Sequence, residues 1–199
     1  MAIPGAIGHF YHIQTALTHI SRTKSYLSND FHADIAHWQT LVHSMATRPT
    51  YLAEIVQHIP TDLGFTDASG QGAGGVLLNP NRDGKHYVWR LRWPADIIAT
   101  LVSFANPNGS ITNSDLELSA LVYQEATFPL ICSKFRWRSP AIGSDNTPTV
   151  SWSFKEASTI NPVVAALLRI RAIANFASSR LPSVFYHPGD LNTMADNAS

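Results

Sequence analysis

The chain has 199 residues, enough to bury a sizeable core, and 45% of them are hydrophobic while only 14% are charged. The 14 Lys and Arg balance the 14 Asp and Glu, and the resulting zero net charge argues against a dedicated basic nucleic-acid binder. Any polyanionic partner must then be held by a local patch or by metal ions.

The cysteine count and the hydropathy argue against a disulfide-stabilised protein and against a membrane-spanning one. The single cysteine, Cys132, rules out an internal disulfide framework. No uninterrupted apolar run approaches the roughly 20 residues of a membrane span, and the first residues lack the basic start of a signal peptide and are broken by Pro4, Gly5 and Gly8. We therefore expect an intracellular protein, cytoplasmic or nuclear, with no membrane partner.

Residues 1–60 are predicted to form a helical connection segment. Residues 31–45 carry apolar side chains three or four positions apart, the spacing of one buried helix face made of Phe31, Ile35, Trp38, Leu41, Val42 and Met45. Residues 28–30 supply candidate N-caps. Six of the nine histidines precede residue 44, but no cysteine and no HExxH pattern accompanies them, so packed or solvated imidazoles are favoured over a zinc site.

Residues 61–199 are predicted to form one α/β domain. Strands at 63–69, 74–79 and 86–93, separated by turn residues, make an antiparallel meander. Residues 93–104 are ambiguous between a helix and a buried extended segment. Residues 113–128 are helical, with five residues on or near one face: Leu116, Ala120, Val122, Tyr123 and Ala126. A strand at 141–146, helices at 147–154 and 161–177, a strand at 183–187 and the start of a helix follow.

Four acidic residues occupy distinctive places in this order. Asp67 lies in the first strand, Glu117 in the first turns of the 113–128 helix, Asp145 at the end of the fourth strand, and Asp196 just past the last strand.

At these positions the chain resembles the ribonuclease H fold, in the form carried by retroelement reverse transcriptases. The matching pieces are TDAS followed by GAGG, the E-L-x-A that starts at Glu117, the SDN at 144–146, and H-x-G-x-x-N-x-x-x-D from His187 to Asp196. Each piece alone is unspecific, but all four occur in order over residues 63–199. The resemblance implies an α/β fold: a mixed five-stranded sheet, three antiparallel strands then two parallel, flanked by helices and truncated at its last helix.

The same resemblance implies a metal-dependent endonuclease that hydrolyses the RNA strand of RNA–DNA hybrids with two Mg²⁺ or Mn²⁺ ions. Two such ions about 4 Å apart can activate a water and stabilise the leaving oxygen, and they prefer carboxylate ligands. Asp67 would bridge both metals, flanked by Glu117 and Asp145, and Asp196 would complete the second site. Clustered carboxylates repel one another, so raised pKa values are expected before metal binds.

Two of these assignments have rivals nearby. Asp115 also lies near the helix start, where the helix dipole favours a negative charge; Glu117 is preferred because it begins the E-L-x-A pattern. Asp190 is the rival of Asp196, which is preferred because it stands four residues after Asn192, the interval of the family.

The roles of Asp145 and His187 have plainer alternatives. Asp145 can be read as a turn or cap residue before Thr147-Pro148. His187 matches the family's histidine that assists product release, but its interval to Asp196 is nine residues (196 − 187), shorter by one than in the cellular and retroviral enzymes. A loop histidine without a catalytic part therefore stays open.

Substrate contacts are predicted near the metals and on one basic patch. Ser69 and Asn146 are candidates to sense the cleaved strand of an A-form hybrid. The basic patch, KFRWR, is a candidate to follow DNA phosphates through Lys134, Arg136 and Arg138. Its alternative reading is a solvated loop or edge strand with a buried tryptophan.

The first third of the chain resembles the segment between a polymerase thumb and its ribonuclease H domain, most closely in DIRS-type elements. The shared features are W-x-x-L ahead of a DAS strand and the terminal NTMADNAS. The resemblance implies a piece of a reverse transcriptase polyprotein, with the polymerase domain as a partner. No Y-x-D-D motif is present, so this chain does not copy nucleic acid itself.

The alternative function is a non-catalytic ribonuclease H-like module, domesticated or of the connection type, kept for binding or packing. Retention of all four carboxylates favours the enzyme, since clustered acids cost stability if metal never binds. A DEDD exonuclease would need Asp-x-Glu where Asp67-Ala68-Ser69 stands, and an integrase would end its set on a glutamate rather than Asp196.

Overall fold

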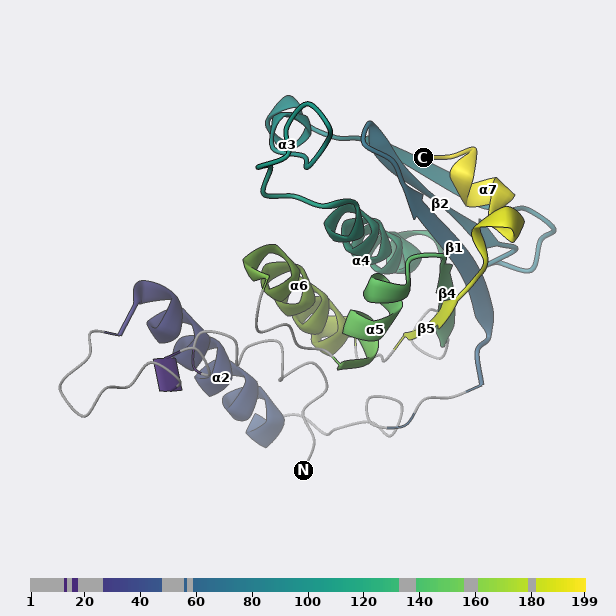
Figure 1. The fold of residues 1–199 in the computed structure, drawn as a ribbon. Helices are drawn as coiled ribbons and strands as arrows, with labels where there is room; N and C mark the ends of the chain where they lie inside the picture. The colour runs from purple at the N-terminus through teal and green to yellow at the C-terminus, as the bar shows by residue number, and fades with distance from the viewer. Residues whose placement is uncertain are drawn as a thin grey trace. The chain divides into compact units, whose positions relative to one another are not determined.

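The chain folds into two compact units, seen here in a computed structural model. It describes residues 27–47, 59–132, 139–155, 161–178 and 182–199, with residues 13, 16, 17 and 56, but not the side chains of residues 30 and 45. The first unit, Met1–Val56 with Lys155–Leu181, contains helices α2 (Asn29–Thr47) and α6 (Pro162–Ser178). The second, Gln57–Phe154 with Pro182–Ser199, contains the sheet (Figure 1). The predicted boundary between residues 60 and 61 stays a prediction.

The second unit is built on one mixed sheet of five strands in the order β3-β2-β1-β4-β5. The strands are β1 (Asp62–Ala68), β2 (Gly72–Leu78), β3 (Tyr87–Arg92), β4 (Pro140–Ser144) and β5 (Ser183–Tyr186). β1, β2 and β3 pair antiparallel, whereas β4 is parallel to both β1 and β5. The predicted mixed sheet, with three antiparallel strands and then two parallel ones, is confirmed, and the ends of β1, β3, β4 and β5 meet along what we call the carboxyl edge of the sheet.

Helix α4 (Asn113–Ile131) packs against β1 and β2 through a polar contact rather than a purely apolar one. The fully buried Gln124 donates from Nε2 to the carbonyl of Val76 (3.0 Å) and accepts from Trp89 Nε1. Glycines leave the space for it: a Cβ on Gly75 would lie 2.6 Å from Gln124 Oε1, and a Cβ on Gly64 would collide with Nε2. Side chains at both positions are excluded, so α4 lies close to the sheet.

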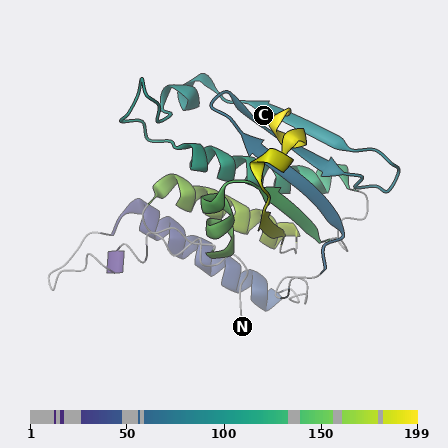
Figure 2. The ribbon, with the colours of Figure 1, turned by 45° about the vertical axis from the view of Figure 1, so that its right-hand side comes forward.

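The opposite face of the sheet carries the C-terminal helix α7 (Thr193–Asp196), shown in yellow in Figure 2. Gly74, next to Gly75 and therefore facing the other way, would collide through a Cβ with the backbone of Ala198. Ala195 and Ala198 are buried, and Arg90 donates to the carbonyl of Asn197. Small residues on both sides thus seat a very short helix against β1 and β2.

Residues 93–112 form a short helix and an ordered loop between β3 and α4. Helix α3 covers only Ala95–Ala99, which resolves the ambiguity left by the sequence. Its Ile97 and Ile98 pack, with Leu101, on a buried cluster that includes Ala68 of β1 and Leu116 of α4. Helix α5 (Thr147–Lys155) follows β4, and a 3-10 turn at Gly189–Leu191 follows β5. No helix within the described residues has the length and apolar character of a membrane span.

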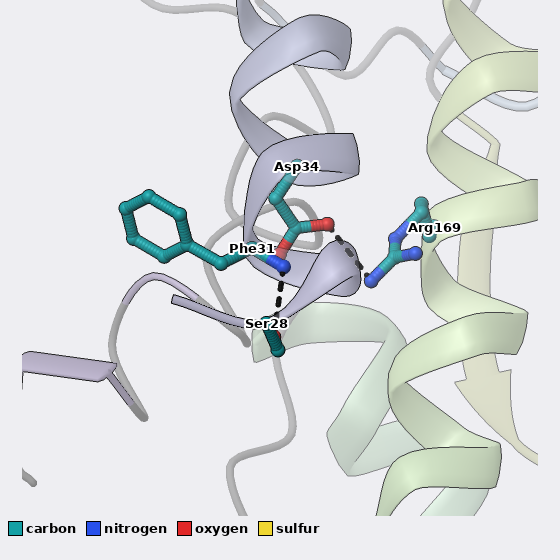
Figure 3. A network of polar contacts seen from close by, with 4 residues as sticks. All are labelled: Ser28, Phe31, Asp34 and Arg169. Carbon is teal, nitrogen blue, oxygen red and sulfur yellow. Dashed lines mark hydrogen bonds and ion pairs between the residues drawn. The ribbon is translucent and has the colours of Figure 1, made fainter. Parts of the chain in front are cut away.

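In the first unit, α2 and α6 are joined by an ion pair between Asp34 and Arg169 at 2.9 Å (Figure 3). Asp34 is fully buried. Ser28 caps α2 by accepting from the N–H of Phe31 at 3.1 Å, as one of the candidate caps predicted. Asn161 caps α6, whose first residue is Pro162, as expected for a helix start.

Two predicted helix faces need correction. On α2 the buried stripe runs through Asp34 and Leu41, so Ile35 and Val42 are exposed, Val42 at 55%. On α4, Tyr123 and Ala126 are exposed, because Gln124 and Phe128 occupy the buried face instead. In each helix a polar residue, Asp34 or Gln124, lies in the buried stripe. The spacing of apolar residues alone does not predict that such a residue is buried.

Because α4 lies close to the sheet, adding one methyl group at the contact should lower the stability of the chain markedly. Gly75→Ala should destabilise the chain by about 1–3 kcal/mol, the usual cost of overpacking, because the added Cβ meets Gln124 and Trp89. Gly70→Ala is the matched control, since its Cβ would lie 3.7 Å from the nearest side chain. The urea midpoints of the two variants provide the measurement, and equal midpoints would contradict this account of the α4 contact.

Candidate metal centre

The carboxyl edge brings three carboxylates into one group. Asp67 lies near the end of β1, and Asp145 directly follows β4, the parallel neighbour of β1. Glu117 lies in the second turn of α4, which begins at the same edge with a Thr112–Asp115 capping box. One carboxylate oxygen from each of Asp67, Glu117 and Asp145 lies within 4.8 Å of the others.

Glu117 is the most buried member of this group, with an exposure of 3%. The backbone N–H of Ala68 donates to its carboxylate, while its Oε2 atom has no hydrogen-bond partner among the described residues. Burial and then the charges of Asp67 and Asp145 raise its pKa from 4.5 to about 9. In the metal-free chain near pH 7 this side chain is therefore a neutral acid.

Asp145 directly follows β4 and is half-buried. Burial and the charge of Asp67 raise its pKa, while its own backbone N–H and His187 act in the opposite direction. Gly189 makes room for the carboxylate, because a Cβ there would lie 2.8 Å from Asp145 Oδ2. The glycine of the H-x-G motif thus has a steric reason to be a glycine.

Asp196 lies beside the group of three without joining it. It is exposed on α7, and burial followed by the charges of Asp67 and Asp145 raises its pKa. The link to β1 is Asn192, which is buried and donates from Nδ2 to the carbonyl of Thr66 at 3.1 Å. The sequence marks Asn192 only by its spacing to Asp196, whereas in the structure Asn192 tethers the segment that carries Asp196 to β1, next to Asp67.

His187 lies against two aromatic rings on the β4–β5 side of the group. Its ring centroid is 4.6 Å from that of Phe65 and 6.3 Å from that of Phe185. The backbone N–H donates to Ser144 at 3.0 Å. His187 is thus held next to Asp145, with which it interacts electrostatically.

The rival acids occupy other positions. The Asp115 carboxylate accepts from the N–H and the hydroxyl of Thr112, at 2.7 and 2.8 Å, and so caps α4. Asp190 is exposed in the 3-10 turn. Neither belongs to the group of three found among the described residues.

The predicted substrate contacts fall into two sets. Ser69 accepts from the N–H groups of Gln71 and Gly72 and so closes the β1–β2 turn. Asn146 caps α5 by accepting from Thr149 at 3.0 Å, and its amide donates to Ser114. Their roles toward a substrate stay predictions, and the basic patch lies outside the described residues, with Lys134, Arg136 and Arg138.

The donor set fits a divalent cation that prefers hard oxygen ligands, such as Mg²⁺ or Mn²⁺. The three carboxylates offer only oxygen, and one buried oxygen of Glu117 has no hydrogen-bond partner in the described part of the chain. A buried, unpartnered carboxylate oxygen is costly unless a cation or a proton satisfies it. The geometry is therefore that of a candidate metal centre.

The comparisons agree with the fold. LC11-RNase H1, isolated from compost by a metagenomic approach, is 14% identical, with 70% of this chain and 93% of that chain covered and a TM-score of 0.51. This chain has a ribonuclease H-like fold. RNase H1 of the halophilic archaeon Halobacterium salinarum NRC-1 is 18% identical (69% of this chain and 92% of that chain, TM-score 0.47). LC11-RNase H1 in complex with RNA/DNA hybrid is 16% identical, with 69% of this chain and 93% of that chain covered and a TM-score of 0.47.

Sequence comparisons gave no match: no protein-family model matches the chain, and no similar curated protein was found. The ribonuclease H-like fold is therefore recognisable here by its structure and by a few short motifs.

The raised pKa of Glu117 predicts a pH-dependent stability of the metal-free chain. Between pH 4.5 and about 9 the folded chain holds a proton on Glu117 that the unfolded chain has released. The free energy of unfolding should therefore fall as pH rises through this window. Glu117→Gln removes the titration, so its dependence should be shallower and its stability at pH 9 higher than that of the wild type.

Urea unfolding in EDTA at several pH values measures this dependence. Asp190→Asn, which alters an exposed acid outside the group, is the control and should keep the wild-type slope. A Glu117→Gln slope as steep as the wild type would show that another group carries the pH dependence.

Proposed function

We propose that the chain is a metal-dependent endonuclease that hydrolyses the RNA strand of RNA–DNA hybrids. The observation that carries the proposal is the group of Asp67, Glu117 and Asp145 at the carboxyl edge of a ribonuclease H-like fold, with a buried carboxylate oxygen left unpartnered. The motifs that resemble retroelement ribonuclease H supply the same three residues and add Asp196.

Each side chain has an assigned role. Asp67, Glu117, Asp145 and Asp196 are the ligands of two Mg²⁺ or Mn²⁺ ions. When bound, the ions would lower the pKa of a water that attacks the phosphodiester and would stabilise the leaving oxygen. Glu117 must release its proton to become a ligand, so metal binding should release protons below pH 9.

Residues around the proposed metal ligands hold these ligands in position or lie where substrate and product would pass. Asn192 tethers the Asp196 segment to β1, and Gly189 leaves space for the Asp145 carboxylate. We assign His187 to product release, supported by its position next to Asp145. Ser69 and Asn146 lie on the turn and the cap that border the ligands, where a hybrid strand would pass.

The decisive experiment is cleavage of a hybrid with labelled RNA, in Mg²⁺ or Mn²⁺. We expect the wild type to cut, and Asp67→Asn, Glu117→Gln and Asp145→Asn to lose at least about 100-fold in rate, since even outer-shell partners of metal sites cost 10–100-fold. Asp196→Asn should lose less, because Asp196 lies outside the group of three.

Two controls sharpen this assay. Asp190→Asn should keep the wild-type rate, and an RNA duplex and a DNA duplex of the same sequence should stay intact. If the wild type leaves the hybrid intact in both metals, the proposed activity is wrong.

Metal binding also separates the enzyme from the non-catalytic module. A ligand that binds only the native state raises stability, by about 2.7 kcal/mol at 100 times its Kd. We expect millimolar Mg²⁺ or Mn²⁺ to raise the Tm of the wild type relative to EDTA, and to have little effect on Asp67→Asn. An unchanged wild-type Tm would support the non-catalytic alternative.

We further propose that the chain is the ribonuclease H part of a reverse transcriptase polyprotein of a DIRS-type retrotransposon, whose polymerase domain is its partner. The support is the W-x-x-L segment ahead of the DAS strand and the NTMADNAS tail. Lys134, Arg136 and Arg138 would contact the DNA strand in this assembly. A longer reading frame that encodes a polymerase would support the assignment.

A further inference from the structure

The loop between α3 and α4 carries a fully exposed aromatic side chain. Phe104 has a relative exposure of 106%, as in an extended chain, and Val102 is exposed at 45%. Single exposed apolar residues are common, so exposure alone says little. Phe104 differs from an ordinary exposed apolar residue because its loop is ordered, lies close to the metal centre and carries no charged side chain.

The loop at residues 102–108 is held by its own hydrogen bonds. Ser103 and Asn106 exchange backbone hydrogen bonds of 3.1 Å on either side of Phe104. The Asn106 side chain donates to the carbonyls of Ala99 and Leu101 at 3.2 and 3.1 Å. The base is closed by a bridge between Leu101 and Ile111. Phe104 is therefore presented at the tip of an ordered turn, which lowers the entropy cost of a contact.

The base of this loop lies at the carboxyl edge, next to the metal centre. A Cβ on Gly70, three residues after Asp67, would lie 3.7 Å from Leu101 Cδ1. Trp93 donates from Nε1 to the carbonyl of Ser69 at 2.9 Å, which ties the start of the segment to the same turn. The segment then leads directly into α4 and Glu117.

The loop and His187 flank the carboxylates from two sides. The loop base is attached to the β1–β2 turn, whereas His187 follows β5 beyond β4. A duplex whose scissile phosphate lies at Asp67 extends along this edge in both directions. On the β2 side of Asp67 the duplex would therefore pass the loop at residues 102–108.

The composition of the loop allows a polyanion such as a nucleic acid to approach it. Residues 97–112 contain no charged side chain, so no carboxylate there repels phosphates. An aromatic ring can pack on the sugars and base edges of the wide, shallow minor groove of an A-form duplex, or stack on an exposed base.

We propose that Phe104 is a substrate-positioning residue whose ring contacts the RNA–DNA hybrid on the β2 side of the metal centre. This inference rests on the proposed function for its substrate. It adds a contact that depends on an aromatic ring rather than on metal or basic charge.

The test measures hybrid binding and hybrid cleavage separately. Binding is followed by fluorescence anisotropy of a labelled hybrid with Asp67→Asn, and cleavage by steady-state kinetics in the otherwise wild-type chain. Phe104→Ala should raise both Kd and KM about 10-fold, within the range of one aromatic–base contact, with kcat little changed. Phe104→Tyr should keep the wild-type values.

Phe154→Ala is the matched control, because Phe154 is a phenylalanine exposed at 65% near the end of α5 and has no assigned role. It should leave Kd and KM unchanged. Equal melting temperatures of all three variants exclude a folding defect as the cause.

The outcomes separate the two proposals. If the chain cleaves hybrid but Phe104→Ala binds and cleaves like the wild type, or if Phe104→Tyr is impaired as much as Phe104→Ala, the Phe104 contact is wrong and the proposed function stands. If the chain binds hybrid in a Phe104-dependent way without cleaving it, the contact stands and the activity is wrong. If it neither binds nor cleaves, both are overturned.

Discussion

The position of α4 on the sheet sets the geometry of the whole site. Two polar contacts, seven residues apart and so on the same face of the helix, hold it there: Glu117 accepts from Ala68, and Gln124 bonds to Val76 and Trp89. An apolar helix face can slide by part of a turn at small cost, whereas buried hydrogen bonds fix one register. Because Ala68 follows Asp67, the register that satisfies Gln124 also brings Glu117 to Asp67.

The metal-free site is an electrostatic compromise. Three carboxylates within 4.8 Å cannot all be ionised at low cost, and the most buried one, Glu117, keeps its proton. Part of this repulsion is offset at Asp145, whose pKa His187 lowers. A divalent cation would replace the proton and satisfy the unpartnered oxygen together, so the arrangement that weakens the free chain at high pH is the one that would favour binding.

The sequence was sufficient for the mixed sheet and for the acids that lie on its strands or directly after them. Asp67 and Asp145 could be placed because parallel strands end at one edge and short motifs marked both positions. Gln124 could not, since apolar periodicity favours Tyr123 and Ala126 and gives no sign that a buried amide would face two glycines. The seat of α7 was missed for a similar reason: Ala195 and Ala198 are too small to form an apolar stripe, and their packing depends on Gly74, more than 100 residues away in the chain. The loop at 102–108 depends on side-chain hydrogen bonds of Asn106, which no spacing rule reveals.

The Asp34–Arg169 pair has a consequence for how the chain can be divided. Asp34 belongs to the N-terminal segment, but Arg169 belongs to α6, which the chain enters only after β4 and leaves before β5. Cutting the chain at residue 60 to obtain a minimal ribonuclease H-like domain would keep Arg169 and discard the carboxylate of Asp34 that pairs with it. Such a piece would carry a guanidinium without the carboxylate that pairs with it in the folded chain. The N-terminal helix is therefore an electrostatic part of the chain that follows it, and a trimmed version should replace Arg169 as well.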